Sequence, residues 1–166
     1  MPVLELGDFA TIIRPGKSIL ALDLGEKTIG VAAADRGLSL SSPVETIQRR
    51  KLAADLKRLS EIWHDRQAQG FVVGLPLNMD GSKGPRVQAT NSFIGELRKA
   101  AAADTKLFGQ EDPPITMWDE RLSTSAVDKF LIGEADLSRA KRAAVVDAMA
   151  ASHILQGALD AIRNIG

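Results

Sequence analysis

The sequence contains no cysteine, few aromatic residues (4%) and no formal net charge at pH 7. The absence of cysteine excludes disulfide bonds, thiolate metal sites and cysteine nucleophiles, and a chain without such links suits a reducing compartment. We therefore expect a cytoplasmic protein. Because 21 basic residues balance 21 acidic ones, no general attraction draws the chain to nucleic acid, and binding of a polyanion would depend on local basic clusters.

Long apolar stretches are also missing. No uninterrupted apolar run reaches the length of about 18 residues that a membrane-spanning helix needs. The first 17 residues carry charges and lack the apolar centre of a signal peptide. At 166 residues the chain can form one hydrophobic core but not two large domains. We expect an N-terminal extension at residues 1–17, a single domain at residues 18–166, and no membrane partner.

The first half of the chain begins with three expected strands. The nearly continuous apolar run Ser18–Gly25 is typical of a strand buried on both faces. Ile29–Ala34 follows so closely that the two strands should form an antiparallel hairpin. A third candidate, Leu38–Ile47, contains Pro43, which is typical of an edge strand or a bend.

Helices and strands then alternate. The expected elements are a helix over Lys51–Gln69 that ends at Gly70, a strand over Phe71–Gly74, a loop over Leu75–Pro85, a helix that begins at Pro85, a strand over Ile115–Trp118, a helix from Ser123 to Gly133, and a long helix over Ser138–Arg163. This order predicts an α/β fold in which helices cover the faces of one sheet.

Three acidic residues occur where water is expected to be scarce. Asp23 interrupts the first apolar run, Glu120 follows a predicted strand end, and Asp147 lies on the apolar stripe of the last helix. A buried carboxylate must shift its pKa, pair with a cation or bind a metal. Together the three could hold Mg²⁺ or Mn²⁺, and two such ions about 4 Å apart support phosphodiester hydrolysis.

Each acid also has a simpler interpretation. Asp23 could belong to an ordinary turn, and Glu120 could pair with its neighbour Arg121. Asp147 could pair with a basic residue earlier on its helix, although the spacing of five or six residues is unfavourable. The two histidines, His64 and His153, are expected on helix surfaces without an evident partner.

Polar and basic residues near these acids are candidates for contacts to nucleic-acid phosphates. A turn-rich loop supplies backbone N–H groups and small polar side chains, and two basic residues lie at the start of the helix that carries Asp147. The candidates are Asn78, Ser82, Arg121, Lys141 and Arg142. A flexible connection and solvated helix faces are the alternatives.

Four segments in this order resemble the YqgF (RuvX) family, described as Holliday junction resolvases and as pre-16S rRNA nucleases. They are Ala21–Ala32, Val72–Ser82, Asp119–Thr124 and Asp147–Gln156, and together they span most of residues 18–162. The resemblance implies an RNase H-like fold with a mixed five-stranded sheet flanked by helices. It also implies that the catalytic acids are Asp23, Glu120 and Asp147, the three already selected from the residue pattern.

The resemblance further implies a metal-dependent endonuclease that uses Mg²⁺ or Mn²⁺ and matures the 5′ end of pre-16S rRNA. The alternative within the family is resolution of Holliday junctions, typically by a symmetric dimer. The partner would be structured RNA or branched DNA, and the protein a monomer or homodimer. The chain departs from the family at Thr28, where arginine is frequent, and residues 1–17 have no counterpart in the resemblance.

Two hypotheses from other classes are consistent with parts of the sequence. A non-catalytic ribosome-assembly factor would use the acids only for structure. An actin-like or sugar-kinase ATPase would use the Asp-Leu-Gly motif as a phosphate loop, but such enzymes bind nucleotide between two RNase H-like lobes, and this chain is long enough for one.

Overall fold

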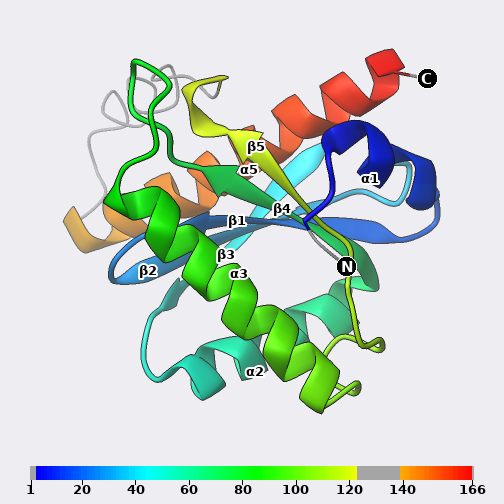
Figure 1. Ribbon diagram of the computed structural model, residues 1–166, viewed down its shortest axis with the longest axis horizontal. Coiled ribbons are helices and arrows are strands. Elements are labelled where there is room, and N and C mark those ends of the chain that lie inside the picture. Colours follow the sequence, from blue (N-terminus) through cyan, green and yellow to red (C-terminus); the bar gives the residue numbers. More distant parts are fainter. Residues whose placement is uncertain (1–2, 123–138, 166) are drawn as a thin grey trace.

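A five-stranded mixed sheet forms the centre of the computed structural model, which describes residues 3–122 and 139–165 (Figure 1). The strands are β1 (Ser18–Leu24), β2 (Thr28–Ala34), β3 (Ser41–Gln48), β4 (Ala68–Leu75) and β5 (Ile115–Asp119). Their order in the sheet is β3-β2-β1-β4-β5. The β1–β2 and β2–β3 pairs are antiparallel, whereas β1–β4 and β4–β5 are parallel. The predicted hairpin and the mixed five-stranded sheet are confirmed.

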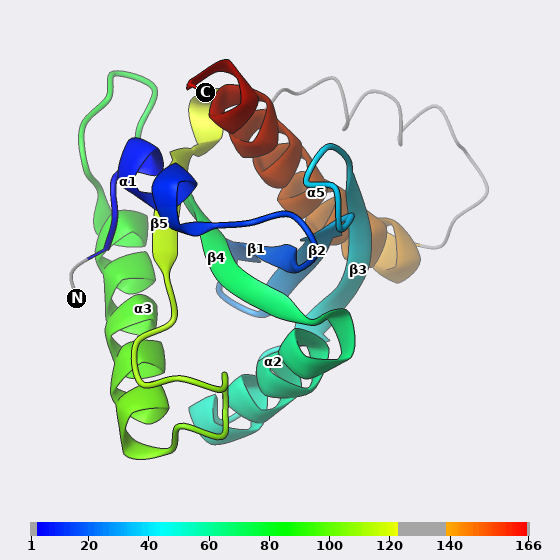
Figure 2. The ribbon, with the colours of Figure 1, turned by 90° about the vertical axis from the view of Figure 1, so that its right-hand side faces the viewer.

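Helices cover both faces of this sheet (Figures 1 and 2). One face packs against α2 (Leu52–Arg66) and α3 (Pro85–Ala103). The other face packs against α1 (Leu6–Ile12) and α5 (Arg139–Ile165). Each side has its own hydrophobic cluster, which explains why the central strands are apolar on both faces. Within the described residues, no helix combines the length and the apolar character needed to cross a membrane.

Alternation along β1 determines which way Asp23 points. Leu20 and Leu22 belong to the cluster under α2 and α3, and Ala21 belongs to the cluster under α5. Successive side chains of a strand point to opposite faces, so Asp23 falls on the α5 face together with Ala21. Asp23, close to the end of this mostly apolar strand, therefore faces helix α5 and not open solvent.

The end of α2 differs from the expectation. Gly70 does not end this helix; α2 ends at Arg66, and Gln67 adopts the left-handed conformation with φ 53°. Gly70 instead lies in β4, where a Cβ atom would approach the Phe9 ring to 2.9 Å. The glycine is therefore required for close packing between β4 and α1, a contact with no local sequence signal.

Residues 3–17 pack onto the same sheet. The Leu4 N–H donates to the Ile115 carbonyl (2.8 Å), and the Thr116 hydroxyl donates to the Leu4 carbonyl (2.9 Å). Phe9 is fully buried in the cluster beneath α5. This segment thus extends the α5 side of the core.

Edge strand β3 contains Pro43, as predicted. The β2–β3 register shifts between Val31 and Ala32, and Pro43 pairs with Ala32 just beyond the shift. Proline lacks a backbone N–H and is tolerated at such edges and irregularities. The helix expected from Ser123 to Gly133 lies outside the described residues.

Candidate active site

Three separate elements bring the predicted acids to one edge of the sheet. Asp23 lies near the end of β1, Glu120 begins a 3₁₀ helix directly after β5, and Asp147 lies on α5. Because β1, β4 and β5 are parallel, their carboxyl ends share one edge, which is where open α/β sheets commonly bind ligands. The negative charges of Glu120 and Asp147 both act on Asp23, so the structure places the three acids together.

Two glycines make this convergence possible. Gly30 pairs with Asp23 across the β1–β2 ladder, and a Cβ atom on Gly30 would lie 2.1 Å from the backbone carbonyl oxygen of Asp147. In β4, a Cβ atom on Gly74 would lie 2.6 Å from Oε1 of Glu120. The strands on either side of β1 therefore leave room for the helix backbone and for the glutamate side chain.

Asp23 and Glu120 form a carboxyl pair. Burial raises the pKa of Asp23 to about 8, and the hydrogen bond to Glu120 together with the charges of Glu120 and Asp147 contributes to the rise. The positive charge of Arg86 opposes it. Two carboxyl groups can share a hydrogen bond only if one is protonated, so this pair retains a proton near neutral pH.

Asp147 is held by a different contact. The Thr28 hydroxyl at the start of β2 donates a hydrogen bond of 2.7 Å to Oδ2 of Asp147. Position 28 is where the chain departs from the resembled family, and the hydroxyl there fixes the orientation of an acid 119 residues away in the sequence. The sequence shows the departure at position 28 but carries no local signal for its contact with Asp147.

Arg121 does not pair with Glu120, which corrects the simpler interpretation of that acid. Its guanidinium binds Asp119, with Nε and Nη2 at 3.0 and 2.7 Å from Oδ2, and its backbone N–H donates to Oδ1. These hydrogen bonds hold the pKa of the Asp119 carboxyl below its ordinary value. Arg121 thereby neutralises the charge of Asp119. Glu120 instead forms a hydrogen bond with Asp23.

The loop between β4 and α3 places two more candidates beside Arg121. Asn78 Nδ2 donates to Ser82 Oγ (3.0 Å), and the Asn78 N–H donates to the Ser82 carbonyl (2.9 Å). Gly81, with φ +88°, lies against the Arg121 guanidinium, since a Cβ atom there would be 3.3 Å from Nη1. These hydrogen bonds hold the loop in a compact shape. Asn78 and Ser82 are nevertheless exposed to solvent.

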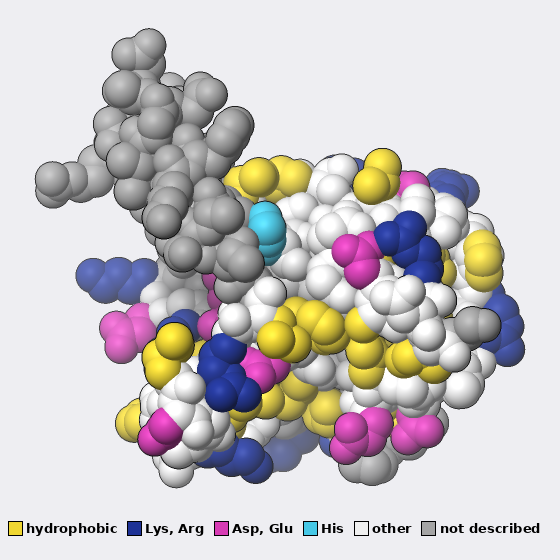
Figure 3. Space-filling model, turned by 90° about the horizontal axis from the view of Figure 1, so that it is seen from above, with side chains coloured by type: hydrophobic (Ala, Val, Ile, Leu, Met, Phe, Trp, Pro, Cys, Tyr) yellow, Lys and Arg dark blue, Asp and Glu magenta, His cyan; other side chains and the backbone are white. Residues whose placement is uncertain are grey.

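The other candidates lie elsewhere. Lys141 and Arg142 belong to α5, but their side chains lie outside the described residues. His64 is exposed on α2, and its Nε2 is 2.9 Å from the Lys106 carbonyl oxygen. His153 is half-buried on α5. Basic and acidic side chains are intermixed on the face seen in Figure 3, which agrees with the absence of a net charge.

The donor set fits a hard divalent cation in its chemistry. Carboxylate oxygens are the ligands that Mg²⁺ and Mn²⁺ prefer. In the part of the chain that the structure describes, no three acidic or histidine side chains already form a compact metal cluster. Asp23 and Glu120 are joined by a hydrogen bond, and Asp147 is bound to Thr28. A cation could replace the shared proton and relieve the repulsion among the three carboxylates.

Two curated proteins are similar to this chain over nearly its whole length. A relative from Rhodospirillum rubrum, named "Putative pre-16S rRNA nuclease", is 50% identical over 162 residues, covering 98% of this chain and 94% of the relative. One from Phenylobacterium zucineum, with the same name, is 47% identical over 99% of this chain and 100% of its own length.

A solved structure shares the fold. It is titled "T. thermophilus RuvC in complex with Holliday junction substrate" and is 13% identical, with a TM-score of 0.50 over 90% of this chain and 97% of that one. At this identity the likeness concerns the fold alone, and it supports the expected RNase H-like architecture. The family model described as "RuvX: Holliday junction resolvase" matches residues 17–161. By this match and the near-full-length relatives, the chain belongs to the RuvX family.

Proposed function

We propose that this protein is a metal-dependent endonuclease that hydrolyses phosphodiester bonds in the 5′-end maturation of pre-16S rRNA. The observation that carries the proposal is the convergence of Asp23, Glu120 and Asp147 at one sheet edge, where burial and neighbouring negative charges raise the pKa of Asp23 to about 8. Perturbed acids of this kind are typical of functional sites. The names of near-full-length relatives favour the RNA substrate.

The three acids would hold Mg²⁺ or Mn²⁺. When bound, such cations polarise phosphoryl oxygens and activate water for attack on phosphorus. Asp23 must lose the proton that it shares with Glu120 before both can act as ligands, so cation affinity should rise with pH. The hydrogen bond from the Thr28 hydroxyl holds the Asp147 carboxylate in one orientation.

Residues around the acids would bind and orient the substrate. The exposed loop that carries Asn78 and Ser82 lies against Arg121. The amide of Asn78 and the guanidinium of Arg121 would donate to backbone phosphates, whereas the Ser82 hydroxyl, which donates to Asp80, would have to turn away from that carboxylate to do so. Arg121 already binds Asp119, which fixes its guanidinium in place. Lys141 and Arg142 remain candidates for the same task from α5.

A cleavage assay with two substrates tests the proposal. The wild type, Asp23→Asn and Asp147→Asn are incubated with a 5′-extended 16S rRNA fragment and with a four-way DNA junction, in Mg²⁺ or Mn²⁺. We expect the wild type to cut the RNA and each variant to lose activity on the order of a hundredfold or more. Glu96→Gln on α3 is the matched control, because Glu96 is exposed and its carboxylate lies 3.7 Å from Nζ of Lys99 on the same helix.

The outcomes separate the competing hypotheses. Preferential cutting of the junction would favour Holliday junction resolution, which the description of the family model supports as the second candidate. RNA binding without cutting in any divalent metal would favour a non-catalytic assembly factor. Variants that cut as fast as the wild type would contradict the assignment of the acids.

A further inference from the structure

A small pocket lies beside the acids, and one of its lining residues, Arg86, also acts on Asp23. Its volume is about 60 Å³, and it lies between the β1–β2 hairpin, the end of β3 and the first turns of α3. The lining residues are Leu24, Gly25, Glu26, Arg49, Arg86, Ala89 and Thr90. Because Gly25 follows Asp23 by two residues, the pocket is a direct neighbour of the acid site.

Arg49 enters this pocket with its guanidinium already fixed. Nη1 donates a hydrogen bond of 2.6 Å to the Gly25 carbonyl, and the guanidinium lies 5.5 Å from the centre of the Phe93 ring. A guanidinium carries five N–H donors, so several remain for a ligand. Of the carboxylates in the described residues, none lies within 4.0 Å of this group. Its charge is therefore available to an anion, and its position is set before binding.

Arg86 supplies a second positive charge to the lining of the pocket. It is the second residue of α3 and is exposed, and its charge acts on Asp23. It likewise has no carboxylate within 4.0 Å among the described residues. The first turn of α3 contains no acidic residue, so the positive end of the helix dipole adds to this potential.

We propose that Arg49 and Arg86 form a subsite for one backbone phosphate of the nucleic-acid substrate, next to the phosphate that is cut. The inference rests on the proposed nuclease function and identifies a site outside the three acids. Planar guanidiniums match the paired oxygens of a phosphate. Glu26 is exposed at the hairpin, where solvent screens its charge.

The size of the pocket favours a phosphate over a base. A volume of about 60 Å³ exceeds the roughly 10–15 Å³ that one water needs and is far below the roughly 300–1,000 Å³ of pockets that enclose whole ligands. The non-bridging oxygens of a phosphate fit such a space, and the attached sugars remain outside. Holding one phosphate here would set the register of the strand, so that the neighbouring phosphate lies at the acids.

The salt dependence of binding tests this subsite without requiring catalysis. A fluorescein-labelled RNA hairpin with a single-stranded 5′ extension is titrated with protein in EDTA at several NaCl concentrations. Losing one phosphate contact should reduce the slope of log K against log salt by roughly 0.7–0.9. For Arg86→Gln we therefore expect about sixfold weaker binding near about 0.1 M NaCl and no difference near about 1 M.

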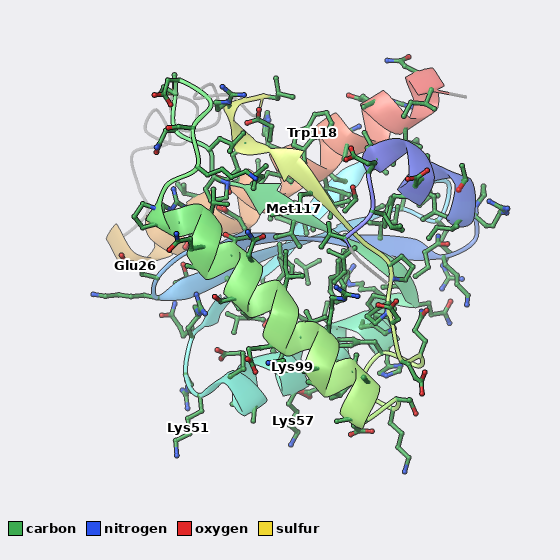
Figure 4. All side chains as sticks on the ribbon, viewed as in Figure 1. Glu26, Lys51, Lys57, Lys99, Met117 and Trp118 are labelled. Carbon is green, nitrogen blue, oxygen red and sulfur yellow. The ribbon has the colours of Figure 1, made fainter. Side chains whose placement is uncertain are left out.

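Lys99→Gln provides the matched control. Lys99 also lies on α3 and is exposed, but Figure 4 places it well along the helix, away from Glu26 and the hairpin. It should keep the wild-type slope. An unchanged slope for Arg86→Gln, or an equal loss for Lys99→Gln, would overturn the subsite.

A double variant tests whether the two arginines hold the same phosphate. The affinity loss of Arg49→Gln/Arg86→Gln should be smaller than the product of the two single losses, because one contact cannot be removed twice. Independent losses would overturn the shared subsite. If the wild type binds the probe but cuts no substrate, the nuclease function fails and the subsite stands; if the wild type binds no nucleic acid, both fail.

Discussion

Replacing Gly30 by alanine should push α5 away from β2 and misplace Asp147. The new Cβ atom would meet the Asp147 carbonyl oxygen at 2.1 Å, whereas ordinary contacts begin near 3.4 Å. The obstacle is backbone, so it cannot be avoided by rotating a side chain. The helix would have to move by about 1 Å or more, and overpacking of this kind typically costs about 1–3 kcal/mol.

Two quantities follow from this displacement. A loss of about 1–3 kcal/mol in the free energy of unfolding corresponds to a Tm lower by roughly 2–12 °C for a chain of this length. A misplacement of about 1 Å in a catalytic group can cost on the order of a hundredfold in rate. Cleavage by Gly30→Ala should therefore fall by far more than its loss of folded protein explains.

Thermal unfolding and single-turnover cleavage of the 5′-extended rRNA fragment measure both effects. Gly95→Ala is the matched control, because Gly95 lies within α3 and a Cβ atom there would meet nothing within 4 Å. Alanine is favoured over glycine in a helix by about 0.5–1 kcal/mol, so this control should be slightly stabilised and fully active. A Gly30→Ala protein with wild-type Tm and wild-type cleavage would refute the close approach of α5 to β2.

Three further predictions concern the acids. Thr28→Val should slow single-turnover cleavage about tenfold, because it removes the hydroxyl that orients Asp147. Thr28→Ser keeps the hydroxyl and should cut at the wild-type rate. If Thr28→Val also cuts at the wild-type rate, Thr28 does not position Asp147. Because the folded-state pKa of Asp23 is about 8 against 3.8 for the free group, the folded protein binds an extra proton between these values, and stability should fall as pH rises through this window. Asp23→Asn should therefore be more stable than the wild type by a few kcal/mol at pH 8 and similar to it near pH 4, as measured by urea unfolding; a constant difference would contradict the raised pKa. Millimolar Mg²⁺ should raise the Tm of the wild type more at pH 8 than at pH 6 and should leave the Tm of Asp23→Asn unchanged. An equal rise in the Tm of that variant would show that the cation binds at another site.

Local patterns in the sequence were sufficient to predict the sheet and to select three acids that the structure brings to one end of it. The continuous apolar run around Asp23 predicted a strand buried on both faces, and helical spacing put Asp147 on the inner face of the last helix. Glu120 was selected because it follows a predicted strand end, and the family motifs supported all three choices. These features depend on residues close together in the chain, where periodicity carries the signal.

Contacts between distant segments could not be predicted in this way. The hydrogen bond from Thr28 to Asp147 exists because Gly30 lets α5 come close, and neither residue reveals the other. The sequence predicts that Gly70 ends a helix, but Gly70 lies in β4, where the absence of a side chain leaves room for Phe9 of α1. The preference of Arg121 for Asp119 depends on the geometry of the 3₁₀ turn that follows β5. The contacts of Thr28 and Gly70 are decided by tertiary packing, which a single sequence does not encode locally. The pair of Arg121 and Asp119 is local, and the turn geometry selects it over the adjacent Glu120.

Direct binding of Mn²⁺ provides the most immediate test that Asp23, Glu120 and Asp147 form one cation-dependent centre. The free ion can be followed by electron paramagnetic resonance at pH 8 with wild type, Asp23→Asn, Asp147→Asn and the surface control Glu96→Gln. We predict that the wild type and the control bind Mn²⁺ alike, and that each acid variant binds at least about tenfold more weakly. Equal binding by all four proteins would contradict the account, because the acids would then not be the ligands of the cation.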